Sequence, residues 1–291
     1  MVDPTDNPWR PVLYARFRGQ PTPMLVLPDA LWTAASLWAG TRAWAKSFRE
    51  SGLMPGDVIA CALPAGSGFV QVLLACLWDG ITFIPVGPPY GVTDALRLQK
   101  PSAEVSIGSG ADDARDWPVF VPDSASQPRG AVSGVRRDET RARGSAVTFL
   151  GPDGEQGATT SLTAHDLLAA AEAHAVAVDL AGGCVMTVMP WHTPTELVYG
   201  LLASLLVADE IVRVPESDSL LRGAIEVAVE HPITHVNLLA SMAGEWMREP
   251  AGSALLMRVK GAAVSGAETS SAEVVAALAG TKLRMVDWRV G

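Results

Sequence analysis

Residues 145–168 read SAVTFLGPDGEQGATTSLTAHDLL and contain the change of pattern that decides the fold. A β-prone run at 146–150 enters a turn-rich loop at 151–157, and a hydroxyl-rich stretch then leads to a helix expected to start at Thr163. A loop between a strand and a helix is a common anion site, because backbone N–H groups and a helix N-terminus both favour negative charge. The stretch therefore predicts an α/β unit with a loop shaped to hold phosphate.

The side chains of this loop oppose phosphate binding. The loop carries Asp153 and Glu155 and has neither Lys nor Arg. Lysine occurs in the chain only at positions 46, 100, 260 and 282. The helix that follows is still specified, because Thr163 and Asp166 have the spacing of a capping box. We therefore expect a loop that keeps its geometry but has lost the positive charge that a phosphate needs.

Short apolar runs alternate with helical patterns on both sides of this stretch. Before it, strands are predicted at 24–27, 58–63, 82–86, 105–107 and 119–121, and helices at 31–48, 69–78 and 93–99. After it, strands are predicted at 185–188, 211–214, 234–236, 262–264 and 283–286, and helices at 164–176, 196–206, 220–230, 242–248 and 271–278. This alternation predicts an α/β fold of βαβ units with mostly parallel sheets.

A polar segment divides the chain. Residues 122–144 are rich in Pro, Gly and Ser, and Arg136, Arg137, Arg141 and Arg143 lie beside Asp138 and Glu139, so a solvated linker is favoured over an anion site. We expect a first α/β subdomain at 1–121, this exposed linker, and a second α/β subdomain at 145–291.

Composition limits the classes of partner. The 291 residues are 48% hydrophobic and 18% charged, with a net charge of −9, which argues against nucleic acid or an anionic membrane as the main partner. Three cysteines, Cys61, Cys76 and Cys184, lie in apolar runs and favour a reducing compartment. The N-terminus lacks an apolar signal core, and the most apolar run, 197–207, is too short to span a bilayer. We expect a cytoplasmic protein without a membrane span.

Two strand ends carry candidate site residues. His192 follows the strand at 185–188, in the kind of loop where open α/β sheets bind ligands, although a structural histidine is the alternative. Ser265–Glu268 follows the strand at 262–264, where small residues would let a flat ring lie on the backbone. A helix-initiating turn explains this segment equally well. The sequence has no H-E-x-x-H, C-x-x-C or G-x-S-x-G motif, so neither a metal nor a catalytic serine is expected.

Several segments together resemble the N-terminal region of the adenylate-forming superfamily, which includes acyl-CoA synthetases, fatty-acyl-AMP ligases and adenylation domains. The segments are LMPGDVI at 53–59, LACLWDGITFIPV at 74–86, MPWH at 189–192, PITHV at 232–236 and VSGAE at 264–268. They occur in the family's order and near its usual spacing. The resemblance implies two βαβ-type subdomains with a cleft lined by strand-end loops.

The resemblance also identifies the loop at 151–159 as the family's phosphate loop, which reads T-S-G-T-T-G-x-P-K-G. Here Ala158 stands at the lysine position, and the degenerate loop comprises Gly151, Asp153, Gly154, Glu155, Gly157, Ala158 and Thr159. The family uses ATP and magnesium, but with this loop we expect no bound cofactor. Its Y-G-x-T-E motif should follow Val286, where the chain reads DWRVG, so the family's C-terminal domain is expected to be absent.

These features favour a domain that is inactive in adenylation and binds a carboxylate or acyl ligand, or a partner protein. The expected ligand cleft is formed by Trp191, His192, Ser265, Gly266, Ala267, Glu268, Asp287 and Trp288, with no residue assigned a catalytic role. One alternative is an active acyl- or aryl-activating ligase with an unusual loop or a separate C-terminal subunit. Another is a structural or interaction protein, and in either case the chain could form a homo-oligomer.

Overall fold

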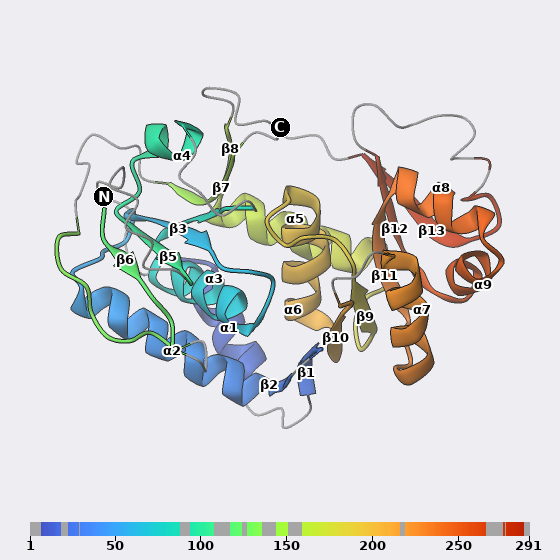
Figure 1. Cartoon of the computed structure of the whole chain (residues 1–291), viewed down its shortest axis with the longest axis horizontal. Helices are drawn as coiled ribbons and strands as arrows, with labels where there is room; N and C mark the ends of the chain where they lie inside the picture. The colour runs from blue at the N-terminus through green and yellow to red at the C-terminus, as the bar shows by residue number, and fades with distance from the viewer. Residues whose placement is uncertain are drawn as a thin grey trace. The chain divides into compact units, whose positions relative to one another are not determined.

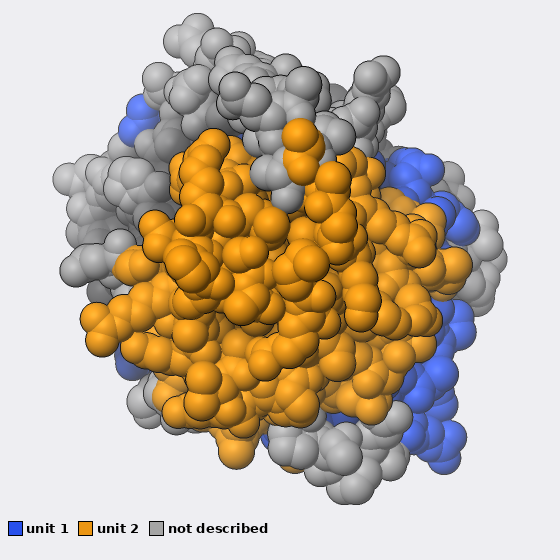
Figure 2. All heavy atoms as spheres, turned by 90° about the vertical axis from the view of Figure 1, so that its right-hand side faces the viewer, with its two compact units in different colours: residues 1–21, 34–169 blue, residues 22–33, 170–291 orange. Residues whose placement is uncertain are grey.

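The structure is a computed structural model, and it describes residues 7–18, 23–28, 30–87, 94–107, 117–123, 127–135, 144–150, 159–215, 219–265, 276 and 278–287. The chain forms two compact units, which have separate colours in Figure 2. Unit 1 comprises residues 1–21 and 34–169, and unit 2 comprises residues 22–33 and 170–291. Each unit is built around its own sheet.

Unit 1 contains a six-stranded sheet in the order β6-β5-β3-β4-β7-β8 (Figure 1). Its strands are β3 (Val58–Ala62), β4 (Thr82–Pro85), β5 (Ala103–Ser106), β6 (Val119–Phe120), β7 (Ser145–Leu150) and β8 (Thr159–Thr163). Its helices are α1 (Trp9–Phe17), α2 (Ala34–Glu50), α3 (Ser67–Asp79), α4 (Asp94–Gln99) and the start of α5 (Ala164–Ala177). All described pairings are parallel except the β7–β8 hairpin.

The core of unit 1 follows from its most apolar elements. Helix α3 is apolar around almost its whole circumference, as expected of a helix enclosed by other elements, and nearly all of its residues are buried. It ends at Gly80, which adopts the left-handed conformation at φ +71° that a helix C-terminus favours. Strands β3 and β4 are buried along their full length, which is typical of parallel strands covered on both faces.

Unit 2 contains a seven-stranded sheet in the order β13-β12-β11-β9-β10-β1-β2. Its strands are β1 (Pro23–Leu27), β2 (Ala30–Thr33), β9 (Cys184–Thr187), β10 (Glu210–Arg213), β11 (His235–Leu239), β12 (Lys260–Ser265) and β13 (Lys282–Asp287). Its helical segments are the rest of α5, η2 (Glu196–Leu202), α6 (Ala203–Val207), α7 (Leu220–Glu230), α8 (Ala240–Arg248) and α9 (Pro250–Arg258). Only the β1–β2 pairing is antiparallel among those described.

The two faces of this sheet differ in character. Side chains alternate along each strand, and one set packs with α7, α8 and α9 in an apolar cluster that includes Met186, Val212, Val236 and Trp246. The opposite set includes Thr187, Arg213, His235 and Asn237, all of them buried. The face that contacts η2 therefore holds buried polar groups, whereas the face under α7 to α9 is apolar.

The α/β fold with mostly parallel sheets is confirmed, but the focal stretch differs from the expectation. Helix α5 does not follow the loop directly, because β8 lies between them and pairs antiparallel with β7, Leu150 opposite Thr159. Threonine is a good strand former, and β8 is a polar edge strand whose exposure alternates. The predicted cap at Thr163 is confirmed in part: its Oγ1 accepts from the Asp166 N–H at 3.2 Å, but the Asp166 carboxylate accepts from the Thr163 hydroxyl at 2.7 Å rather than from the Thr163 N–H of a full capping box.

The predicted boundary at 122–144 also differs from the division into units. The division falls within α5, because β7 and β8 belong to the first sheet, and β1 and β2 cross to the second. Part of the expected linker is fixed on unit 1: Ser47 donates to the Gly130 carbonyl at 2.6 Å, and the Val132 N–H donates to Ser51. Three further elements were not predicted: α1, β2 at the start of the helix expected at 31–48, and α9.

Candidate functional site

The carboxyl ends of five parallel strands lie along one edge of the unit 2 sheet. Strand β12 pairs with β13 in a register that places Ser265 beside Asp287, and β11 pairs with β12 with Leu239 beside Val264. Strand β9 ends at Thr187, beside Arg213 at the end of β10. Open parallel sheets bind ligands outside this edge, so the edge is the candidate site.

The strand order identifies the point along this edge at which a ligand is most readily held. Strand β9 lies between β10 and β11, so the chain leaves β9 in one direction and later returns to its other side. Right-handed crossovers in opposite directions place their helices on opposite faces of the sheet, and here η2 and α6 follow β9, whereas α7 precedes β11. Such a switch point is where doubly wound sheets hold ligands, and it lies at the ends of β9 and β11.

The loop after β9 begins at this switch point and carries Trp191 and His192. Trp191 is only 1% exposed, so its ring supports the loop from within. His192 is half-buried. Burial lowers the pKa of the His192 imidazole, and the Arg213 cation lowers it further. A neutral imidazole at a strand end can donate one hydrogen bond and accept another, which suits a polar ligand group.

Arg213 fixes the shape of that loop. Its Nη1 donates to the Met189 carbonyl at 2.6 Å and, at 3.4 Å, to the Thr187 carbonyl. The guanidinium also lies 5.6 Å from the centroid of the Trp191 ring, within cation–π range. The Arg213 side chain is buried, and a buried cation is costly unless such partners surround it. The loop conformation and the arginine therefore stabilise each other.

Glu196 lies on the same face of the sheet and starts the π-helical segment η2. It is fully buried, and neither carboxyl oxygen has a hydrogen-bond partner in the part of the chain that the structure describes. Burial raises the pKa of this carboxyl to about 8. The Arg213 cation and the nearby Met189 and Val188 backbone N–H groups lower the pKa but do not offset burial, and these N–H groups lie outside hydrogen-bond geometry. A π-helical turn is rare and frequently occurs at functional sites.

Buried polar groups form a row beside Glu196. Arg213 pairs with Thr187 across β10 and β9, and Asn237 follows Val236, which pairs with Met186 across β11 and β9. The Asn237 amide donates to the Tyr199 carbonyl of η2 at 2.9 Å, whereas the buried Thr187 hydroxyl has no hydrogen-bond partner among the described residues. The ends of the three central strands thus present polar atoms on one face, at the level of the candidate edge.

Comparison with solved structures shows which known proteins share the fold of this chain. No protein-family model matches the chain, and no curated protein matches it. The solved structure of VinN with L-aspartate matches with a TM-score of 0.72 and 17% identity, over 95% of this chain and 74% of that one. The Klebsiella oxytoca NpsA N-terminal subdomain, in complex with 3-hydroxyanthranilyl-AMSN, matches with a TM-score of 0.73 and 14% identity, over 97% of this chain and 72% of that one.

A third structure belongs to a named enzyme. O-succinylbenzoate coenzyme A synthetase (MenE) from Bacillus subtilis, in complex with AMP, matches with a TM-score of 0.70 and 13% identity, over 94% of this chain and 71% of that one. NpsA also occurs as the adenylation part of an artificially fused adenylation–PCP di-domain. The chain has the fold of the N-terminal region of adenylating enzymes. The expected resemblance is therefore confirmed for the fold.

The adenylating-enzyme fold brings some of the predicted cleft residues to one edge. Trp191, His192, Ser265 and Asp287 all lie at or just beyond strand ends of the unit 2 sheet, although only the backbone of Ser265 and Asp287 is described. The other predicted cleft residues lie outside the described residues, namely Gly266, Ala267, Glu268 and Trp288. Of the predicted phosphate loop, Thr159 is described as the exposed first residue of β8, and Gly151, Asp153, Gly154, Glu155, Gly157 and Ala158 lie outside.

Sequence reasoning missed Arg213, Glu196 and Thr187 in this adenylating-enzyme fold. A signal for two of them was present, because Arg213 interrupts the apolar run IVRV and Glu196 precedes the run LVYGLL. A charged residue inside an apolar run is either exposed or buried with a purpose. Only the structure shows that Arg213 lies on the sheet face that contacts η2, and that Glu196, in η2, is buried near this arginine.

The described residues contain no group of three His, Cys, Asp or Glu side chains able to hold a metal ion, so we assign no residue to magnesium. Within the same residues, no helix has the length and apolarity needed to cross a membrane.

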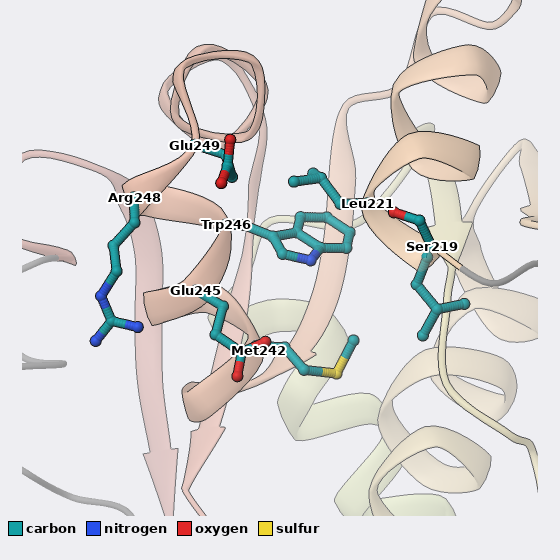
Figure 3. Close-up of a pocket in the computed structure, with 8 residues that line it drawn as sticks. Ser219, Leu221, Met242, Glu245, Trp246, Arg248 and Glu249 are labelled. Atoms are coloured by element: carbon teal, nitrogen blue, oxygen red, sulfur yellow. The ribbon is translucent and has the colours of Figure 1, made fainter.

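Unit 2 also has a surface pocket of about 700 Å³. It lies between the start of α7 and helix α8 (Figure 3). Eight residues line it: Ser219, Leu220, Leu221, Met242, Glu245, Trp246, Arg248 and Glu249.

Proposed function

We propose that this chain binds a carboxylate-bearing ligand at the carboxyl edge of the unit 2 sheet and does not itself catalyse adenylation. The observation that carries the proposal is the loop after β9, which Arg213 holds in one conformation through the Met189 carbonyl and the Trp191 ring. A loop fixed before a ligand arrives loses little conformational entropy on binding. His192 extends from this loop and is the polar group we assign to the ligand.

The ligands of structural relatives support the class of ligand. VinN has been solved with L-aspartate and with 3-methylaspartate, and NpsA with a 3-hydroxyanthranilyl compound. These are carboxylic acids or acyl groups derived from one. A carboxylate at the strand ends of unit 2 would lie near Arg213, the buried cation of this edge. The proposal therefore assigns to this chain the same broad class and names no single acid.

The phosphate loop supports the absence of adenylation. A lysine at position 158 would make a charge-assisted contact to phosphate, and each hydrogen bond to a charged group is worth about 1.5–3 kcal/mol. Ala158 cannot make this contact, and Asp153 and Glu155 add repulsion. Two carboxylates in place of hydroxyls and a lysine would oppose triphosphate binding.

Two measurements on the purified chain test the two halves of the proposal. ATP–pyrophosphate exchange with L-aspartate, 3-methylaspartate and 3-hydroxyanthranilate should stay at background. Calorimetry with the same acids, and with an acyl-sulfamoyl adenosine, should show that at least one ligand binds without ATP. Exchange well above background would overturn the proposal and identify an active ligase.

A matched pair of histidine variants locates the ligand. His192→Ala should weaken binding roughly 10-fold, because one hydrogen bond to a charged carboxylate is lost. His165→Ala is the control, since His165 is exposed on α5 and has no role in the proposal. Equal losses in the two variants, or no binding of any acid to the unaltered chain, would reject this site and favour an interaction protein.

A further inference from the structure

The pocket between α7 and α8 has an apolar interior and a charged rim. Trp246 is 4% exposed and forms the floor, with the partly buried Leu221 and Met242 beside it. Figure 3 shows the Trp246 ring between Leu221 and Met242, with its nitrogen on the Met242 side. Glu245 and Glu249 are exposed on the rim. The pocket thus combines an apolar floor with two carboxylates.

The Glu245 carboxylate is placed against the local electrostatics. It lies in the last turn of α8, where negative charge is unfavourable, whereas Glu249 is both the residue after α8 and the N-cap of α9, where negative charge is favoured. The described part of the chain gives neither side chain an ion pair or hydrogen bond. Arg248 lies between them in sequence but extends to the opposite side of α8 from Trp246 (Figure 3). Such local conflict is expected where residues serve binding.

The indole N–H of Trp246 is a second, independent observation. The side chain is more than nine-tenths buried, yet its nitrogen remains open to solvent and makes no hydrogen bond within the described residues. An indole N–H that lines a pocket can exchange water for an acceptor on a ligand. The floor of the pocket therefore offers one donor, and the rim offers negative charge.

We propose that the α7–α8 pocket binds a lysine or arginine side chain of a partner protein. The apolar floor would contact the aliphatic stem, the carboxylates of Glu245 and Glu249 would pair with the cationic head, and the Trp246 N–H would donate to a backbone carbonyl of the same partner. A free amino acid fits less well, because its own carboxylate would meet the acidic rim. A polyamine fits less well, because it has no acceptor for the indole.

The charge of unit 2 favours the same class of partner. This unit contains 8 Lys and Arg residues but 15 Asp and Glu residues. The negative electrostatic field of this unit increases the association rate of basic segments. This effect becomes weaker as salt is added. The inference uses none of the residues assigned to the strand-end ligand, so its test is separate from that of the proposed function.

The test uses blocked amino acids as probes of the full chain. Nα-acetyl-arginine methylamide and Nα-acetyl-lysine methylamide should shift the ¹⁹F resonance of Trp246 in protein labelled with 5-fluorotryptophan, a resonance assigned by Trp246→Phe. Nα-acetyl-norleucine methylamide, which lacks the charge, and free arginine should bind at least 5-fold more weakly. Equal affinity for charged and uncharged probes would overturn the proposal, as would the absence of any shift with the blocked basic probes.

Surface variants separate binding from folding. The Glu245→Gln/Glu249→Gln variant should fold normally by circular dichroism and lose at least 5-fold in affinity for the blocked arginine probe. Glu172→Gln/Glu230→Gln is the matched control, because it removes two carboxylates from exposed positions outside the pocket, and it should bind the probe within about 2-fold of the unaltered chain. Affinity unchanged in the double variant would show that the acidic rim does not recognise the probe, and would also overturn the proposal.

Discussion

Arg213 and Met189 are joined by a 2.6 Å hydrogen bond between the guanidinium Nη1 and the backbone carbonyl, at the point where the chain leaves β9. The bond links the end of β10 to the loop after β9, which are neighbours in the sheet. The same guanidinium lies over the Trp191 ring. One buried cation thus joins two strand ends and an aromatic side chain, and the conformation of the candidate site depends on it.

Replacing Arg213 should therefore loosen the loop. Arg213→Met should lower the free energy of unfolding by about 2–4 kcal/mol, because the Met189 carbonyl loses its donor and the Trp191 ring loses its cation–π partner. Arg213→Lys should recover only part of this loss, since an ammonium lacks the planar fork. Urea unfolding gives both values, and Arg222→Lys, at an exposed ion pair with Glu226, is the control that should change stability by less than about 0.5 kcal/mol. If the Arg213→Lys variant is as stable as the unaltered chain, a positive charge alone is enough to hold the loop after β9, and the planar guanidinium is not required.

The sequence predicted the central strands of both sheets because they are continuous apolar runs, and it therefore predicted the edge that carries His192, Ser265 and Asp287. It did not predict β8, because TTSLT is a polar edge strand whose pairing with β7 is set by tertiary contacts. It did not predict α9 either, because Pro250 and Gly252 favour a loop locally. Proline is nevertheless well placed in the first turn of a helix.

The buried polar groups of the site were beyond sequence reasoning for a different reason. Whether Arg213 and Glu196 face solvent or the sheet depends on strand register and on the π-helical turn, and neither is encoded in hydrophobic periodicity. Periodicity indicates which residues share a face, but only the packed structure shows which charge is enclosed with which partner.

Glu196 should make the chain less stable as pH rises. Its pKa is about 8 in the folded chain and near its ordinary value of 4.5 when unfolded, so the folded state holds a proton that the unfolded state has released. Stability is therefore highest below pH 4.5 as far as this group is concerned, and it falls between pH 4.5 and 8 by up to roughly 5 kcal/mol. Glu196→Gln should flatten this part of the profile and be the more stable variant at pH 8 in urea titrations. An unchanged slope would show that Glu196 is ionised in the folded chain.

Glu196 and Gly200 should be energetically coupled. A Cβ at Gly200 would collide with the Glu196 carboxyl, so Gly200→Ala should destabilise the chain by about 1–3 kcal/mol despite the better helix propensity of alanine. In a Glu196→Ala background the collision is absent, and the same substitution should be neutral or stabilising. A double-mutant cycle measured by urea unfolding should give a coupling above about 1 kcal/mol. Additive effects would mean that the two side chains do not meet.

His174 should act on stability in the opposite direction to Glu196. Its ring stacks on Tyr199 at 4.5 Å, and burial lowers its pKa to about 4, so it is neutral when folded and binds a proton near pH 6.5 when unfolded. The unfolded state holds more protons between pH 6.5 and 4, and stability falls by up to roughly 3 kcal/mol as pH is lowered through that window.

His174→Phe keeps the stacked ring and removes the titration, so it should reduce the slope of unfolding free energy against pH by about one proton between pH 4 and 6. His192 and His235 also have lowered pKa values and will leave a residual slope of the same sign. The exposed His165, changed to Phe, is the control that should leave the slope unaltered. If His174→Phe and the unaltered chain show the same slope, His174 is protonated in the folded state, and its stacking on Tyr199 then involves an imidazolium.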